Sequence, residues 1–213
     1  MLRHLPASLC LALLFTGCDD VEEDASGDKP HSHGLVTRLG ITFTPDDGGD
    51  PVRVEWADPE LDGDPIIDPL ILDDAGDDDT HVARTFSVEL DVWNDLEDPP
   101  SEVTPEILEL GVEHWFFFTG SATESSATEA NPDALLAWEY ADEDAEGLPL
   151  GLINDVSTVG VGEGELVVTL RHLVPNDGQP TKVEGLDALV AADGFSAIPG
   201  GNDIQVVFPV DVQ

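Results

Sequence analysis

Two short segments of this chain place acidic residues at alternate positions, a spacing that can hold a calcium ion. Each segment also has a glycine directly after its third acid. The acids are Asp58, Glu60, Asp62 and Asp64 in DPELDGD, and Asp142, Asp144 and Glu146 in DEDAEG. Ca²⁺ takes six to eight oxygen ligands, and alternate acids converge on one ion when the chain curls around it. We therefore predict a Ca²⁺ cofactor at one or both segments, with solvated acidic turns as the alternative.

Neither segment completes an EF-hand loop. The twelfth position, which needs a bidentate Glu, holds Pro69 in the first segment and Ile153 in the second. Flanking helices are not predicted either. An ion bound here would therefore occupy a loop between strands.

His114 and His172 are the residues best placed for a transition-metal site. His114 opens the aromatic segment HWFFFT, and His172 ends the segment LVVTLRH. Zn²⁺ and Cu²⁺ need three or four nitrogen or oxygen ligands that converge. Two expected strand ends can meet across a sheet and supply two of them. The alternative is a pair of ordinary hydrogen-bonded histidines at the margin of a sheet.

Sequence signatures of catalysis are missing. The chain has no G-x-S-x-G, no H-E-x-x-H and no glycine-rich phosphate loop, and no cysteine follows Cys18. Carboxylate pairs are too common in so acidic a chain to indicate a hydrolase. We therefore predict a non-enzymatic protein. Trp93 shares a strand face with Glu89 and Asp91, so we expect it to be exposed and available to a ligand.

Alternating apolar and polar residues predict a fold built mainly of strands. The segments with this pattern, or with a continuous apolar run, are 35–43, 52–56, 86–92, 114–119, 136–140, 166–170 and 204–212. Segment 114–119 is apolar on both faces, so we expect it in the centre of a sheet. One short helix is predicted after Thr104 as its cap, with Pro105 in the first turn, and a second around 184–192. This content predicts a mainly β fold: an antiparallel β-sandwich, Ig-like or similar, with one or two short helices.

Residues 1–17 have the three parts of an export signal, with an apolar run too short to span a bilayer as a helix. Thr16 and Gly17 precede Cys18, an order that resembles the bacterial lipobox, in which the cysteine is acylated and becomes the new N-terminus. The other cysteine, Cys10, would leave with the signal. Cys18 would then have no disulfide partner, and lipidation accounts for it. The alternative is an ordinary signal peptide with a chance cysteine.

We predict three regions: a lipoprotein signal peptide at 1–17, an acidic disordered tether at 18–33 and a single β-sandwich domain at 34–213. The tether has almost nothing apolar to bury. The lipid makes the membrane a partner and places the chain in the cell envelope. Asp19 after the cysteine favours inner-membrane retention in some bacteria, whereas acidic runs there favour surface display in others. The inner membrane and both faces of the outer membrane therefore stay open.

The charge of the chain excludes one class of partner. It carries 46 Asp and Glu against 7 Lys and Arg, a formal net charge of −39. Such a surface repels phosphate backbones, so we predict no nucleic-acid binding. Adaptation to salt and specific cation sites both account for the acidic excess. The sequence does not identify a protein or glycan partner.

Segments in order along nearly the whole domain carry a family resemblance. They are ITFTPDDGGDPVRVEWADPELDGDP, VELDVWNDLEDPPSEVTPEI, EHWFFFTG, EYADEDAEGLPLGL, LVVTLRH and NDIQVVFPVDVQ. The chain resembles uncharacterised Gram-negative envelope lipoproteins, best represented in the Bacteroidetes and sometimes labelled as type 1 periplasmic binding fold proteins. The resemblance implies a secreted, lipid-anchored domain with recurring acidic loops at 58–64 and 142–147, and no known activity. The two βαβ lobes of a type 1 binding fold are not expected here, because the predicted strands do not alternate with helices.

These features favour a non-enzymatic, lipid-anchored β-sandwich of the cell envelope, stabilised by calcium and serving in binding or scaffolding. The alternative is an envelope module that captures a ligand or a transition metal with His114 and His172, with Trp93 beside a groove.

Overall fold

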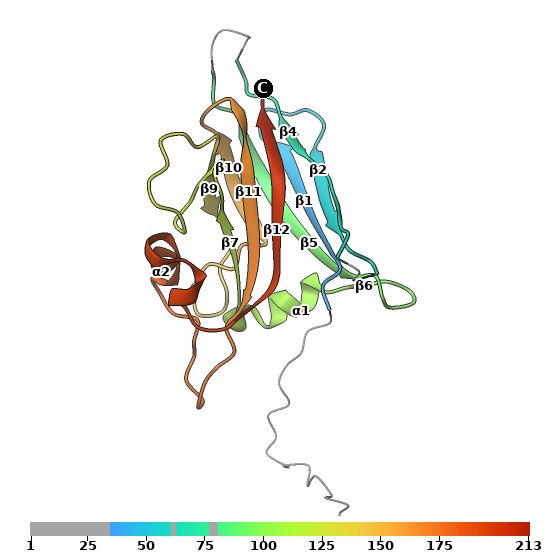
Figure 1. The fold of residues 1–213 in the computed structure, drawn as a ribbon, viewed down its shortest axis with the longest axis vertical. Coiled ribbons are helices and arrows are strands. Elements are labelled where there is room, and N and C mark those ends of the chain that lie inside the picture. Colours follow the sequence, from blue (N-terminus) through green and yellow to red (C-terminus); the bar gives the residue numbers. More distant parts are fainter. Residues whose placement is uncertain (1–34, 61–62, 77–80) are drawn as a thin grey trace, which may run out of the picture. The chain divides into compact units, whose positions relative to one another are not determined.

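The computed structural model describes residues 35–60, 63–76 and 81–213, and the described residues belong to one compact unit. The predicted signal peptide, the tether, Cys18 and Asp62 lie outside the described residues. Two β-sheets pack face to face, and only two short α-helices accompany them in the described chain. The predicted mainly β, sandwich-like fold is confirmed (Figure 1).

Sheet A contains eight strands. In spatial order along its main path they are β3 (Ile66–Ile67), β2 (Val52–Ala57), β1 (Arg38–Pro45), β5 (Thr85–Asn94), β10 (Ile153–Thr158), β9 (Leu136–Tyr140) and β8 (Thr123–Glu124). The short strand β6 (Ser101–Glu102) also pairs with β5. Strand β10 was not predicted, because its buried positions Asn154 and Thr158 are polar and hide the alternation.

Sheet B contains four strands. Their spatial order is β4 (Leu70–Leu72), β12 (Gly201–Val212), β11 (Gly162–His172) and β7 (His114–Thr119). Strand β7 is apolar on both faces, as expected, but it lies at the edge of this sheet. The prediction of a central strand was therefore wrong. The second face of β7 is buried against residues of the helical segment 186–198 rather than against another strand.

The sheets were predicted to be antiparallel, but two short strand pairs are parallel. Strand β4 runs parallel to β12, and β8 runs parallel to β9. Only Asp68 and Pro69 separate β3 of sheet A from β4 of sheet B. The chain therefore crosses between sheets at this point and joins sheet B beside β12.

The main core lies between the two sheets. Trp138 of sheet A stacks on Phe118 of sheet B, with ring centroids 4.1 Å apart, and meets Phe43 edge-on at 5.9 Å. These rings are buried together with the inward-facing Leu, Ile and Val residues of both sheets. Burial of this apolar surface is the main favourable term for such a fold.

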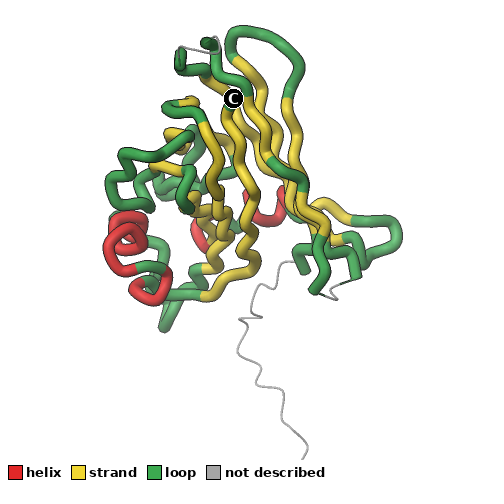
Figure 2. The backbone as a smooth tube through the Cα atoms, turned by 45° about the horizontal axis from the view of Figure 1, so that its top comes forward, coloured by secondary structure: helices red, strands yellow, loops and turns green. Residues whose placement is uncertain are grey.

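Two helices cover parts of the sandwich, and Figure 2 shows α2 (Leu186–Asp193) beside the strands rather than between the sheets. Trp115 and Phe117, on the outer face of β7, pack with Leu186 and Val190 of α2. Helix α1 (Thr104–Glu109) and the 3₁₀ turn η1 (Gly111–Glu113) lead into β7. Thr104 was predicted to cap this helix, but the N-cap residue of α1 is Val103. The Thr104 hydroxyl accepts the backbone N–H of Val92 at 2.8 Å, which ties the helix to β5.

Candidate functional site

The two histidines predicted as metal ligands lie side by side at one end of sheet B. His114 begins β7 and His172 ends β11, and they occupy paired positions of the antiparallel ladder. Their rings stack with centroids 4.7 Å apart and planes 11° from parallel. His114 shares a strand face with Phe116 and Phe118, so its side chain belongs to the interior end of the sandwich, where it is fully buried.

Asp203 of β12 joins the two histidines because the strand carries an extra residue at this point. The register between β11 and β12 shifts after Leu170, where Asn202 pairs with Arg171 and Ile204 with Leu170. Asp203 is thus left between two paired residues, as in a β-bulge, which commonly re-aims a side chain. Ligand atoms of His114, His172 and Asp203 all lie within 4.8 Å of one another. We call these three residues the histidine cluster.

Neighbouring groups orient both rings. His114 Nδ1 lies 2.9 Å from the carbonyl oxygen of Leu110. A carbonyl only accepts, so Nδ1 carries the hydrogen and Nε2 of the neutral ring carries the lone pair. His172 lies between two carboxylates: its Nε2 is 3.7 Å from Glu113 Oε2, and its Nδ1 is 3.9 Å from Asp203 Oδ1. The side chains of His172, Glu113 and Asp203 keep partial access to solvent.

Comparisons with known proteins add no family to this geometry. No protein-family model, curated protein or solved structure matches the chain. Neither helix in the described part of the chain is long and apolar enough to cross a membrane.

The acidic loop at 142–147 is organised by hydrogen bonds from the protein itself. Asp142 accepts the backbone N–H groups of Gly151, Leu152 and Ile153 at 2.7–3.0 Å. Oδ1 of Asp144 accepts the N–H groups of Glu146 and Leu148 at 2.8 and 3.0 Å. The predicted ligands Asp142 and Asp144 thus hold a tight turn, while the Glu146 side chain is exposed.

Lys182 supplies the cation at this loop. Its Nζ lies 2.7 Å from Oδ2 of Asp144, and both side chains are at most 1% exposed. The same ammonium donates to the carbonyl oxygen of Gly111 at 2.9 Å and lies over the ring of Trp115. An ion bound to Asp144 through Oδ2 would have to displace Lys182. Calcium binding at this loop stays a prediction.

We expect Asp142→Ala to lower the free energy of unfolding by about 1–3 kcal/mol, because the partly buried N–H groups of Gly151 and Leu152 and the exposed N–H of Ile153 lose their acceptor. This loss should be equal in calcium and in EDTA at constant ionic strength, as followed by urea unfolding of the full chain. A loss confined to the calcium sample would contradict the structural role and place an ion at the loop. Glu146→Ala is the matched control and should cost little.

The first acidic segment is less organised in the described chain. Asp58 is buried, and its carboxylate accepts the N–H of Gly63 at 3.3 Å. Glu60 and Asp64 have exposed side chains, and Asp62 lies outside the described residues. In the part of the chain that the structure describes, the histidine cluster is the one convergent set of three or more possible metal ligands, and it includes no residue of either acidic loop.

Trp93 is partly buried and contacts two neighbouring side chains. The guanidinium of Arg38 lies over its ring at 4.8 Å, and its indole N–H donates to Asp91 at 2.7 Å. Arg38 also pairs with Asp95 through two hydrogen bonds of 2.9 and 2.8 Å, which lower the pKa of Asp95. Trp93 therefore forms part of a surface network that joins β1 to β5, and ligand binding at this residue stays a prediction.

Sequence reasoning found the two histidines but missed Asp203, Glu113 and Lys182. The Asp203 carboxylate reaches the cluster through a change of register, which alternation does not reveal. Glu113 directly precedes His114 in the sequence, but nothing in the sequence indicates that its carboxylate lies near His172. Lys182 carried a usable signal, since it is one of only two lysines in the chain, the other being Lys29 in the predicted tether.

Proposed function

We propose that this chain is a non-enzymatic, lipid-anchored module of the cell envelope that captures one divalent transition-metal ion at His114, His172 and Asp203. The observation that carries the proposal is the convergence of these three side chains from three neighbouring strands within 4.8 Å. Anchoring rests on the sequence order before Cys18.

The donor set suits a borderline cation better than calcium. Two imidazole nitrogens and one carboxylate are ligands that Zn²⁺ and Cu²⁺ accept, whereas Ca²⁺ prefers oxygen alone. Metal-bound histidines usually donate their second ring N–H to a carbonyl or carboxylate. Leu110 meets this requirement for His114, and Glu113 stands at the corresponding position for His172. The ion would sit next to His114 Nε2, His172 Nδ1 and Asp203.

Binding requires the cluster to contract. Zn–N bonds are about 2.0–2.1 Å long, so tetrahedral ligand atoms lie roughly 3.4 Å apart. The hydrogen bond to Leu110 fixes His114, while His172 and Asp203, with side chains 16% and 18% exposed, have room to turn toward it. The same exposure gives an ion a path from solvent.

The proposal predicts one zinc ion per full chain. Zinc affinity is measured by competition with a chromophoric chelator and stoichiometry by metal analysis, in a background in which His31 and His33 are replaced by glutamine. That background removes a second histidine pair in the predicted tether. His172→Gln and His114→Gln should each weaken binding by at least 100-fold, because a ligand is lost.

His81→Gln provides the matched control, since His81 lies away from the cluster and pairs with Asp74. It should leave zinc affinity unchanged. Cobalt substitution gives an independent readout: four-coordinate Co²⁺ shows strong visible absorption, which the His114 and His172 variants should lose. Undiminished zinc affinity in the double variant His114→Gln/His172→Gln would overturn the proposal.

A further inference from the structure

We propose that the open edge of strand β9 binds a short, extended, cationic segment of a protein partner, which adds to sheet A as a further strand. This inference is independent of the histidine cluster. It rests on the hydrogen-bonding direction of β9, on the hollow beside it and on the charge of that hollow.

One side of β9 is only partly paired. Strand β10 runs along the whole of one side, from Leu136 opposite Thr158 to Tyr140 opposite Asn154. On the other side, β8 reaches only Leu136 and Ala137. Among the described residues, no strand continues β8 beside the stretch from Trp138 to Tyr140.

The backbone groups of Tyr140 point to this open side. Ala141 N–H donates to the Ile153 carbonyl at 3.0 Å, and Val159 N–H donates to the Leu135 carbonyl at 2.8 Å, at the two ends of the β9–β10 ladder. Hydrogen-bonded and non-hydrogen-bonded pairs alternate in an antiparallel ladder. The residues of β9 that bond to β10 are therefore the odd-numbered ones. Leu136 N–H accordingly turns to the other side and donates to Ala122.

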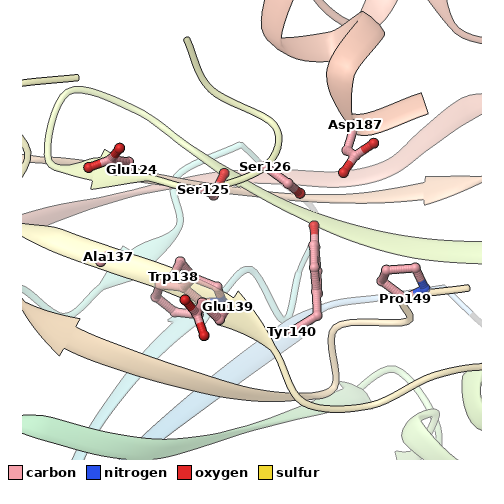
Figure 3. Close-up of a pocket in the computed structure, with 9 residues that line it drawn as sticks. All are labelled: Glu124, Ser125, Ser126, Ala137, Trp138, Glu139, Tyr140, Pro149 and Asp187. Atoms are coloured by element: carbon pink, nitrogen blue, oxygen red, sulfur yellow. The ribbon is translucent and has the colours of Figure 1, made fainter. Parts of the chain in front are cut away.

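A hollow of about 680 Å³ lies along this edge. Its walls include the β9 edge, Ser125 and Ser126 after β8, and Asp187 of α2. Figure 3 shows Tyr140 pointing toward Asp187, with Ser126 beside them. The space is therefore bounded by a strand edge on one side and by Ser126, Asp187 and Pro149 on the others, and an added strand can pair with such an open edge.

The negative charge of the hollow favours a cationic partner segment. Glu124, Glu139 and Asp187 line it, and no Lys or Arg does. A second copy of this chain, with its net charge of −39, is repelled, and so is its own acidic tether at 18–33. An extended segment with Lys or Arg at alternate positions can pair its backbone with Tyr140 and direct its cations to Glu124 and Glu139, which face the same side of sheet A.

The test uses fluorescent seven-residue peptides in which Lys alternates with Val or Thr, titrated into the full chain and followed by anisotropy. Two further versions carry N-methyl groups on alternate residues: one at the odd-numbered positions of the peptide and one at the even-numbered positions. A strand on an open edge presents every second N–H to its neighbour, so we expect one version to bind at least about 10-fold more weakly and the other to match the unmodified peptide. A Glu-for-Lys peptide should not bind.

The protein variant Glu124→Gln/Glu139→Gln should weaken binding of the Lys peptide several-fold, because it removes the two carboxylates on the face that the Lys side chains reach. The matched control Glu102→Gln/Asp50→Asn removes the same charge from exposed residues elsewhere and should not. Equal binding of both methylated peptides would overturn the proposal, because attraction would then be electrostatic without strand pairing. Sedimentation of the full chain tests the other occupant. Self-association of the chain, together with loss of peptide binding in the associated form, would also overturn the proposal and assign the edge to a second copy.

Discussion

Replacing Lys182 with methionine should lower the free energy of unfolding by about 3–5 kcal/mol, because it leaves the Asp144 carboxylate buried without a cation. Both side chains are at most 1% exposed, and Nζ lies 2.7 Å from Oδ2. The substitution also removes the hydrogen bond to the carbonyl of Gly111. Urea unfolding of the full chain measures the loss.

The pH dependence of this loss follows from the pKa of Asp144. Burial acts to raise that pKa, but hydrogen bonds from Lys182 and from the backbone N–H groups of Leu148 and Glu146 outweigh it and hold the pKa below 3.8. The folded-state pKa is thus lower than the unfolded-state pKa. The carboxylate therefore stabilises the fold fully above about pH 4, and this contribution is lost as the pH falls through the lowered pKa. The penalty of Lys182→Met should accordingly shrink in acid.

Two further variants distinguish a buried ion pair from a general charge effect. Lys182→Met/Asp144→Asn should recover most of the stability, since a neutral pair replaces an isolated charge and the amide oxygen still accepts the turn N–H groups. Arg84→Met, which breaks the exposed pair with Asp47, should cost about 0.2–1 kcal/mol. A loss of similar size in Lys182→Met and Arg84→Met would show that the buried pair contributes no more than a surface pair.

Trp138→Ala should lower the free energy of unfolding by about 3–5 kcal/mol, because it opens a cavity where the two sheets meet. Trp138 stacks on Phe118 of the opposite sheet and contacts Phe43 of its own. Trp138 is 3% exposed, so nearly all of its ring surface takes part in this packing. The midpoint of urea unfolding reports the change, provided that the slope stays the same.

Trp93→Ala is the matched control for this experiment. It removes the same side chain from a partly buried surface position, where the ring packs against Arg38 and donates to Asp91. The expected loss is about 1 kcal/mol, mainly from the cation–π contact and one hydrogen bond. Equal losses in the two variants would contradict the assignment of Trp138 to the inter-sheet core.

The strands were predictable where one face is apolar and the other polar. In β12, Ile204, Val206, Phe208 and Val210 alternate with exposed residues, and the alternation alone places them inside. In β7 the same reasoning found the strand and misplaced it, because a continuous apolar run does not reveal what covers its second face. That cover is α2, which lies far along the sequence.

The candidate site was predictable only in part, for a related reason. The positions of His114 and His172 at strand ends follow from local pattern, and their meeting follows once β7 and β11 are neighbours. The Asp203 carboxylate joins them through the register shift after Leu170, a property of two paired strands rather than of either one. Likewise, the spacing of Asp142 and Asp144 indicates a loop around a cation, but it does not tell a metal ion from the ammonium of Lys182.

The place of β12 inside sheet B governs when the protein can finish folding. Leu70 of β4 pairs with Val210, so β4 has no sheet partner until residues near 210 have left the ribosome. A nascent chain ending at residue 200 contains His114 and His172 but not Asp203, and its inter-sheet core is open on one side. Such long-range pairing is slow to form and leaves apolar surface exposed meanwhile. The proposed metal-binding end of the sheet is therefore among the last parts that an emerging chain can assemble.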